Sequence, residues 1–345
     1  MQTLSAVVPA NATRVLIRGA GVAGLSLAYE LAQRGLPVKV AEKRAQLAGN
    51  ASWQAGGMLA PWCECETAER IVLTLGRRAI DWWDEALPGE VVRNGTLVLA
   101  QPRDRRELDR FARRTAGHVL LDRATLAGLE PDLADRFADG LFFAGEAHLD
   151  PRRALTALQQ KLQSMGVAFC FARDGAESAQ RQVEPAGPVA DCTGIAAASP
   201  ALRGVRGEML ILRCPDVTLS RPVRLLHPRF PIYIVPRADH HFMVGATMIE
   251  SDAAGPVTAR SVIELLNAAY ALHPAFAEAE IIEAGVGIRP AFPDNLPRVK
   301  RDGDIIQFNG LYRHGFLLAP AMAEKAANLI IGLMQSGRVL HETHH

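Results

Sequence analysis

The stretch that decides the fold class is RVLIRGAGVAGLSLAYELAQRGLPVKVAEKR, residues 14–44. Residues 15–17 form a short apolar run typical of a buried strand, and apolar residues at helical spacing follow the glycines. Gly35 suits the end of that helix, and residues 38–41 indicate a second strand that ends at Glu42. The stretch therefore predicts a βαβ unit at the start of an α/β chain.

The turn between the first strand and the helix carries its glycines in the order G-x-G-x-x-G. Gly19 permits a tight turn, Gly21 lets the backbone approach a pyrophosphate, and Gly24 lets the helix pack closely against the strand. Free N–H groups at the helix N-terminus favour phosphate groups. Glu42 lies 21 residues after Gly21, at the place of the acid that hydrogen-bonds an adenosine ribose. The pattern predicts a dinucleotide site and suits NAD and FAD equally.

Length, charge and cysteine content narrow the class of protein. The 345 residues allow one large or two ordinary domains, and 49% apolar residues are enough for a substantial core. The 38 basic and 37 acidic residues argue against a nucleic acid or an anionic membrane surface as the main partner. The sequence shows no apolar run of the roughly 18–20 residues that a membrane span needs. Five cysteines without CxxC spacing predict a reducing, cytoplasmic location.

The rest of the chain alternates predicted helices and strands after a frayed start at residues 1–13. Helices are predicted at residues 67–87, 104–116, 150–165, 261–273 and 320–334. Strands are predicted at residues 96–100, 166–172, 188–194 and 305–308, with several more between 205 and 250. Because no polar linker divides the chain, we expect two domains between which the chain crosses more than once.

Two further stretches concentrate glycine and other small residues. GNASWQAGGMLAP (49–61) follows the predicted ribose site, and its small residues would let backbone lie against a flat ring system, a plain loop being the alternative. GVGIRPAFPDNLPRV (285–299) precedes FNGLYRHGFLLAPAMAE (308–324). Arg289 and Arg313 in these two segments can each grip a carboxylate with two parallel hydrogen bonds, the alternative being a solvated surface arginine.

Together these stretches resemble the D-amino-acid oxidase superfamily of FAD-dependent oxidoreductases, and within it the glycine oxidases of thiamine biosynthesis. Matching segments run in the family's order along nearly the whole chain: RGAGVAGLSLAYELAQRG, AGGMLAPWCECE, HLDPRRALTAL, GVRGEMLIL, YIVPRADHHFMVGAT, GIRPAFPDNLP and YRHGFLLAPAMA. The resemblance implies a Rossmann-like FAD-binding domain and a second, substrate-binding domain with a mixed or antiparallel sheet. It places the FAD-binding domain at residues 14–89, 146–204 and 286–345, and the substrate-binding domain at 90–145 and 205–285.

The resemblance implies FAD bound without a covalent link, because related sarcosine oxidases use a late cysteine and none follows Cys214. It assigns Arg289 to the substrate carboxylate, Tyr233 to a supporting hydrogen bond, and Arg313 to a second position beside the substrate. It implies no catalytic side-chain base, because the flavin performs the hydride transfer. The cofactor positions that it implies are Gly19, Gly21, Val22, Ala23, Gly24, Glu42, Lys43, Ala51, Ser52, Gly56, Gly57, Met58, Leu311, Tyr312, Arg313, His314, Gly315, Phe316 and Leu317.

The sequence departs from the family's pattern in two places. Leu311 and His314 stand where the family often has histidine and asparagine. Between Cys170 and Asp191 the chain is short, so we expect the hairpin that usually contacts the adenine to be missing or degenerate. These departures bear on the substrate more than on the cofactor.

The function that the resemblance implies is oxidation of a small, glycine-type amino acid to its imine, with oxygen reduced to hydrogen peroxide. In the thiamine branch the glycine imine supplies the thiazole. A D-amino-acid or N-methyl-amino-acid oxidase or dehydrogenase, an NAD-dependent dehydrogenase, and a flavin-binding scaffold or subunit of a larger dehydrogenase are the alternatives. We expect no metal, since the thiols of Cys63 and Cys65 alone are a poor zinc set. A homo-oligomer is suggested by analogy with the family alone.

Overall fold

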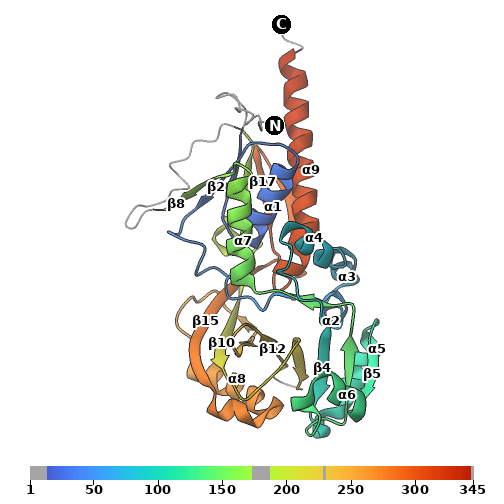
Figure 1. The fold of residues 1–345 in the computed structure, drawn as a ribbon. Coiled ribbons are helices and arrows are strands. Elements are labelled where there is room, and N and C mark those ends of the chain that lie inside the picture. The colour runs from blue at the N-terminus through green and yellow to red at the C-terminus, as the bar shows by residue number, and fades with distance from the viewer. Residues whose placement is uncertain (1–13, 173–186, 228–230, 343–345) are drawn as a thin grey trace, which may run out of the picture.

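The computed structural model describes residues 14–172, 187–227 and 231–342. Two sheets lie one below the other, and the chain passes between them several times, as expected from the missing linker (Figure 1). The predicted frayed start at residues 1–13 and most of the short region after Cys170 lie outside the described residues.

The upper sheet has six strands in the order β16-β17-β9-β1-β2-β8. Five are parallel, and β16 pairs antiparallel with β17 at one edge. Val15 and Ile17 of β1 have no exposed surface, because a central parallel strand is covered on both faces, and this explains the short continuous apolar run. The strands are β1 (Val15–Arg18), β2 (Val38–Glu42), β8 (Ala168–Phe171), β9 (Val189–Asp191), β16 (Arg298–Asp302) and β17 (Ile305–Asn309).

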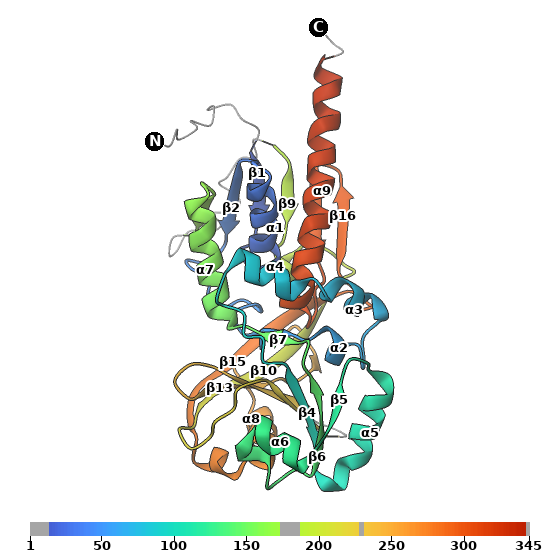
Figure 2. The ribbon, with the colours of Figure 1, turned by 45° about the vertical axis from the view of Figure 1, so that its right-hand side comes forward.

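Helix α1 (Val22–Gln33) packs between α7 (Pro151–Ser164) and α9 (Gly315–Glu342) against the upper sheet (Figure 2). The predicted start of α7 is confirmed, since the Asp150 side chain accepts hydrogen bonds from the first backbone N–H groups of the helix. By length and composition, residues Gly315–Ser336 of α9 could cross a membrane, yet 61% of that stretch is buried inside the protein, as in a core helix.

Helix α9 begins five residues earlier than predicted, at Gly315 rather than near Pro320. A proline inside a helix leaves the carbonyl four residues before it without its usual N–H donor. Here that carbonyl belongs to Phe316, and the indole nitrogen of Trp83 donates to it at 2.8 Å. A hydrogen bond from a distant helix therefore lets α9 continue through Pro320.

The helix predicted at residues 67–87 is two helices, α3 (Arg70–Gly76) and α4 (Ala79–Ala86). Both pack against α9: Gly76 lies against Leu317, and Trp83 packs onto Phe316. Because the helix is interrupted, the predicted apolar stripe is not one face, and Ile71 is 44% exposed.

The lower sheet has nine strands, with the order β14-β10-β13-β12-β11-β4-β6-β5 and with β15 paired to β10. Its pairs are antiparallel except for β4 beside β11. The strands are β4 (Thr96–Ala100), β5 (Val119–Asp122), β6 (Asp139–Phe143), β10 (Arg203–Arg213), β11 (Val223–Leu226), β12 (Ile232–Pro236), β13 (His241–Gly245), β14 (Ile249–Glu250) and β15 (Glu280–Ala291).

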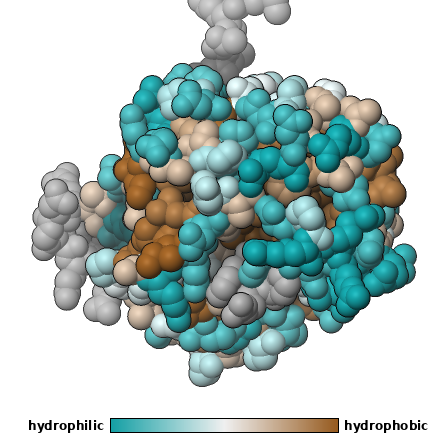
Figure 3. All heavy atoms as spheres, turned by 90° about the horizontal axis from the view of Figure 1, so that it is seen from below, coloured by the Kyte–Doolittle hydropathy of each residue, from teal (hydrophilic) through white to brown (hydrophobic). Residues whose placement is uncertain are grey.

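Helices α6 (Arg123–Leu129) and α8 (Ala259–Leu272) cover the lower face of this sheet, and α5 (Arg105–Arg114) packs beside β4 and β6. Leu126 and Leu265 join Phe242 of β13 in one buried core. Figure 3 shows this end of the molecule, where hydrophilic side chains cover most of the surface and apolar ones form separate patches. The helices thus leave the upper face of the sheet free to meet the first domain.

Short elements join the two sheets. β3 (Met58–Leu59) pairs with β7 (Ala147–His148), and α2 (Pro61–Glu64) follows β3 directly. The long strands β10 and β15 run through the predicted domain boundaries at 204/205 and 285/286. The domain bounds therefore stay a prediction, and the site lies where these strands pass between the sheets.

Candidate active site

A cavity of about 510 Å³ lies between the two sheets, at the carboxyl ends of β1 and β2. All the predicted cofactor and substrate residues line it except Gly24. A Cβ atom on Gly24 would lie 1.9 Å from the carbonyl oxygen of Gly19, so this position must be glycine for α1 to pack on the turn. Gly24 therefore supports the site from behind, in agreement with its predicted packing role.

The cofactor half of the cavity is the part built by the glycine turn, the start of α1 and residues 42–58. Gly19 has a φ of +100°, and a Cβ there would lie 2.5 Å from the carbonyl oxygen of Cys192. Gly21 precedes the first helical residue, Val22, and the first turn holds no acidic side chain. The positive end of the helix thus faces the cavity with no acidic side chain in its own first turn.

Ser52 lies directly at this helix end. Its Oγ accepts a hydrogen bond from the Val22 N–H at 3.1 Å. A serine hydroxyl can rotate away, which would release the Val22 N–H to an oxygen ligand, or it can hydrogen-bond a phosphate itself. The sequence placed Ser52 beside the cofactor without indicating this contact.

Glu42 is buried at the end of β2 and ties the glycine turn to the strand. Its Oε2 accepts the Ala20 N–H at 2.8 Å, and its Oε1 accepts the Arg44 N–H at 3.0 Å. Arg44 also reaches Oε1 with its guanidinium at 3.3 Å, a partner that the sequence did not indicate. The carboxylate is therefore oriented at the predicted ribose position, beside Lys43.

Gly56 and Gly57 need to be glycine because of protein neighbours. A Cβ on Gly56 would lie 2.7 Å from the ring of Tyr233, and one on Gly57 would lie 2.1 Å from the Leu149 carbonyl oxygen. The predicted reason for glycine at these positions was the close approach of a flat ligand. The close contacts with Tyr233 and Leu149 give a second reason. Ala51, Ser52 and Met58 also line the cavity.

The substrate half is the part of the cavity built by β10, β11, β12, β15 and the loop before α9. Arg289 on β15 donates from Nη1 to the carbonyl oxygen of Thr247 at 3.1 Å. Its guanidinium lies against Gly207, where a Cβ would be 2.2 Å from Nη2. Tyr233 on β12 pairs with Arg224 of β11 and with Gly245 of β13. The structure therefore brings both predicted substrate residues to one cavity.

Glu64 at the end of α2 organises a charged cluster that the sequence did not reveal. Its Oε2 lies 3.1 Å from Arg313 Nε and 3.3 Å from His314 Nδ1, and its Oε1 pairs with Arg224. Burial alone would raise the pKa of Glu64, but the guanidinium groups of Arg313 and Arg224 hold it well below its usual value. Burial also lowers the pKa of His314, so this histidine is neutral at neutral pH.

The environment of Arg313 differs from the predicted one. Its guanidinium pairs with Glu64 and donates to Thr67, so part of its hydrogen-bonding capacity is taken by the protein. Arg224 lines the same cavity with a buried Nε that has no hydrogen-bond partner among the described residues. With one carboxylate against Arg224, Arg289 and Arg313, this half carries net positive charge and suits an anionic ligand.

Neither Glu64 nor Arg224 could be found from a motif. Glu64 stands between two cysteines that suggested only a poor metal set, and Arg224 lies in an ordinary strand. Among the described residues, no three His, Cys, Asp or Glu side chains are grouped to hold a metal ion.

The residues of the cofactor half fit a dinucleotide. The N-terminus of α1 suits a pyrophosphate, Glu42 suits a ribose, and the cavity continues past Gly56 to the substrate half. A sequence profile of the DAO family, described as FAD dependent oxidoreductase, matches residues 14–329. This match overturns the alternative of an NAD-dependent dehydrogenase.

Two curated relatives and one solved structure show what the chain is similar to. A Rhizobium etli protein assigned as the thiamine biosynthesis oxidoreductase ThiO is 58% identical over 92% of this chain and 96% of its own. The glycine oxidase of Pseudomonas aeruginosa is 27% identical over 92% of this chain and 95% of its own. The crystal structure of iminodiacetate oxidase from Chelativorans sp. has a TM-score of 0.77 at 26% identity, covering 92% of this chain and 95% of that one.

The predicted fold class, the FAD cofactor and the resemblance to the D-amino-acid oxidase superfamily are confirmed by these matches. The chain belongs to the DAO family of FAD-dependent oxidoreductases.

Proposed function

We propose that the protein is an FAD-dependent amino-acid oxidase that converts a small amino acid, glycine first of all, to its imine in thiamine biosynthesis. The observation that carries the proposal is the position of Arg289. Thr247 and Gly207 orient it, and it lines the same cavity as Tyr233, which continues from the dinucleotide half. The thiamine assignment is supported by the Rhizobium etli relative at 58% identity.

In this proposal the chain positions the substrate and the cofactor supplies the redox chemistry. Arg289 binds the carboxylate with parallel charged hydrogen bonds, and Tyr233 adds a further donor. FAD held by the glycine turn, the start of α1 and Glu42 would supply the acceptor for the hydride of the substrate Cα–H. Hydride loss from Cα requires a neutral amine, and Glu64, which is paired with Arg224 and Arg313, is not a free carboxylate that would stabilise a protonated one. Holding Cα in one place is then the main contribution of the protein.

Oxygen is the proposed final electron acceptor and leaves as hydrogen peroxide. The test is to mix the FAD-loaded protein with glycine without oxygen, follow the loss of oxidised flavin absorbance, and then admit air and measure peroxide. We expect flavin reduction and stoichiometric peroxide. Reduction without peroxide would replace oxygen by another acceptor. An unchanged flavin spectrum with glycine, sarcosine, D-alanine and iminodiacetate would overturn the proposal that the protein is an amino-acid oxidase.

A substrate with a second carboxylate or an N-substituent is the second candidate. Arg224 and Arg313 leave the substrate half with positive charge beyond what one carboxylate at Arg289 needs. The likeness to iminodiacetate oxidase points in the same direction. A higher kcat/KM for iminodiacetate than for glycine would favour this candidate, and the reverse would favour glycine.

We also propose a cytoplasmic location, supported by Cys63, Cys65, Cys170, Cys192 and Cys214, all of them free thiols. The predicted homo-oligomer stays a prediction, which light scattering of the FAD-loaded protein would test.

A further inference from the structure

A buried ion pair lies beside the substrate half of the cavity and is not part of its wall. Arg206 and Glu208 stand on one face of β10, two residues apart, and are 5% and 0% exposed. The Arg206 Nε donates to Glu208 Oε1 at 2.7 Å. Neither residue lines the cavity, whereas Gly207 between them does, because side chains alternate along a strand.

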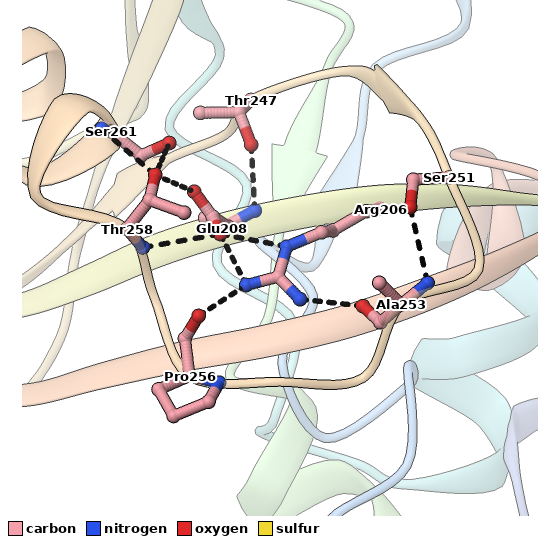
Figure 4. Close-up of polar contacts among 8 residues, drawn as sticks. All are labelled: Arg206, Glu208, Thr247, Ser251, Ala253, Pro256, Thr258 and Ser261. Carbon is pink, nitrogen blue, oxygen red and sulfur yellow. Dashed lines mark hydrogen bonds and ion pairs between the residues drawn. The ribbon is translucent and has the colours of Figure 1, made fainter.

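The pair holds the segment of residues 246–258, here called the roof segment (Figure 4). Arg206 donates to the carbonyl oxygens of Ala253 and Pro256 in its middle. The Glu208 carboxylate accepts from the Thr258 N–H at 3.4 Å and from its hydroxyl at 3.3 Å. The Glu208 backbone exchanges hydrogen bonds with Thr247 at the other end of the segment, at 2.9 and 3.1 Å. The Arg206 and Glu208 side chains thus fix the middle and the far end of the roof segment, and the Glu208 backbone fixes the Thr247 end.

The roof segment in turn forms part of the cavity. Ala246, Met248 and Ala254 line it, and the Thr247 carbonyl oxygen accepts the hydrogen bond from Arg289 Nη1. Gly207 supports the same guanidinium from the strand below. The three consecutive residues 206–208 therefore bear on where Arg289 lies: Gly207 leaves space for its guanidinium, and Arg206 and Glu208 hold the segment that carries the Thr247 carbonyl oxygen.

We propose that Arg206 and Glu208 are positioning residues that set the orientation of Arg289 for the substrate carboxylate through the roof segment. Burying an ion pair costs desolvation free energy, and the pair seldom adds much to the stability of the fold. A geometric role therefore accounts for the buried Arg206–Glu208 pair better than a stabilising role does. The inference rests on the proposed function of Arg289 in substrate binding.

The experiment measures carboxylate binding in the FAD-loaded protein. Glycolate, which has the carboxylate of glycine but no amine, serves as the probe, and its Kd is read from the change in flavin absorbance. Arg206→Lys keeps the charge but cannot reach Glu208 and two carbonyl groups with one planar fork. We expect its glycolate Kd and its glycine KM to rise about 10- to 100-fold while kcat changes much less.

Glu208 gives a graded comparison. Glu208→Gln retains acceptor oxygen for Arg206 and Thr258, so its glycolate Kd should stay closer to that of the wild type than the Kd of Glu208→Ala. Gly207→Ala tests the other support without burying or exposing a charge. The Cβ of the new alanine would occupy the place of the Arg289 guanidinium. We therefore expect the protein to fold and bind FAD, with a glycolate Kd about 100-fold higher than that of the wild type.

Arg221 provides the matched control. It forms a buried ion pair with Glu130 at 2.7 Å and donates to the carbonyl oxygens of Asn94 and Leu129, but it does not line the cavity. Arg221→Lys should lower the melting temperature as Arg206→Lys does and leave the glycolate Kd unchanged. A similar rise in Kd for both lysine variants would mean general destabilisation and would overturn the proposal.

Arg289→Ala separates the two hypotheses. If it leaves glycolate binding intact, the proposed substrate site itself fails. If it abolishes glycolate binding while Arg206→Lys and Gly207→Ala bind as the wild type does, the site stands and the positioning role is overturned.

Discussion

The two halves of the cavity are built in different ways. The cofactor half uses mainly backbone: a glycine turn, the N-terminus of α1 and the Glu42 carboxylate, whose partners Ala20 and Arg44 lie in the same stretch of residues 14–44. The substrate half uses charged side chains from four separate places, with Glu64 between Arg224 and the pair Arg313 and His314. A backbone site tolerates few changes of shape, whereas a side-chain site depends on charge balance. Substitutions should therefore affect the two halves through different measurements.

The largest effect is expected in the cofactor half. Gly24→Ala would place a methyl group 1.9 Å from the Gly19 carbonyl oxygen and force α1 away from the turn. We expect complete loss of bound FAD, measured by flavin absorbance after purification. Gly128→Ala, in a helix where no atom lies within 4 Å of the new Cβ, is the control and should retain FAD. An FAD-loaded Gly24→Ala protein would show that the backbone half is more tolerant than this comparison states.

The second largest effect is expected when the charge balance of the substrate half is broken. Glu64→Gln would leave Arg224 and Arg313 without their buried anion, which typically costs about 3–5 kcal/mol. The free energy of unfolding in urea should fall by this amount while the purified protein still contains FAD. Glu250→Gln, which breaks the exposed pair with Arg203, should change stability by less than about 1 kcal/mol. Equal losses in the two variants would contradict the charge-balance account.

Glu146 extends the comparison to pH. Its Oε1 accepts the Cys63 N–H at 2.8 Å in α2, the helix that carries Glu64, and burial raises its pKa to about 7. The folded protein then keeps a proton that the unfolded chain loses near its usual pKa of about 4.5. The Glu146 contribution to stability is therefore complete below about pH 4.5 and is lost as the pH rises through 7.

Glu146→Gln should remove this contribution, because an amide does not titrate. The difference in unfolding free energy between variant and wild type should shift in favour of the variant by roughly 3 kcal/mol from pH 4.5 to pH 8. Burial lowers the pKa of His148 to about 3, which gives a pH dependence of opposite sign, but it is present in both proteins and cancels in the difference. A difference that does not vary with pH would place the Glu146 pKa near its ordinary value.

The smallest effect is expected for the supporting hydrogen bond. Tyr233→Phe keeps the ring against Gly56 and removes one hydroxyl, so the fold and the FAD content should not change. One hydrogen bond to a charged group is worth about 1.5–3 kcal/mol, or roughly a 10- to 150-fold loss in kcat/KM for glycine. Wild-type kinetics would remove Tyr233 from the substrate half.

The sequence predicted the cofactor half better than the substrate half for a physical reason. The glycine turn, α1 and Glu42 lie within one βαβ unit, so local spacing determines their geometry. Glu64 and Arg224 are far apart in the chain, and only tertiary packing shows that they form a pair. Arg289 was a candidate from its own segment and Tyr233 came from the family resemblance, whereas the contacts of Arg289 with Gly207 and Thr247 could not be predicted from the matching segments. The early start of α9 was missed for the same reason, since it depends on Trp83 from a distant helix.

Helix α9 offers a suitable place to attach a label or a second protein. Its first turn lines the cavity, and its 28 residues at 1.5 Å each extend about 42 Å to the far side of the upper sheet (Figures 1 and 2). A dye, a surface linker or a second enzyme joined to the end of α9 would therefore lie far from the cavity. The same rod would keep the attachment point at a fixed distance from the flavin site, which suits distance measurements by energy transfer.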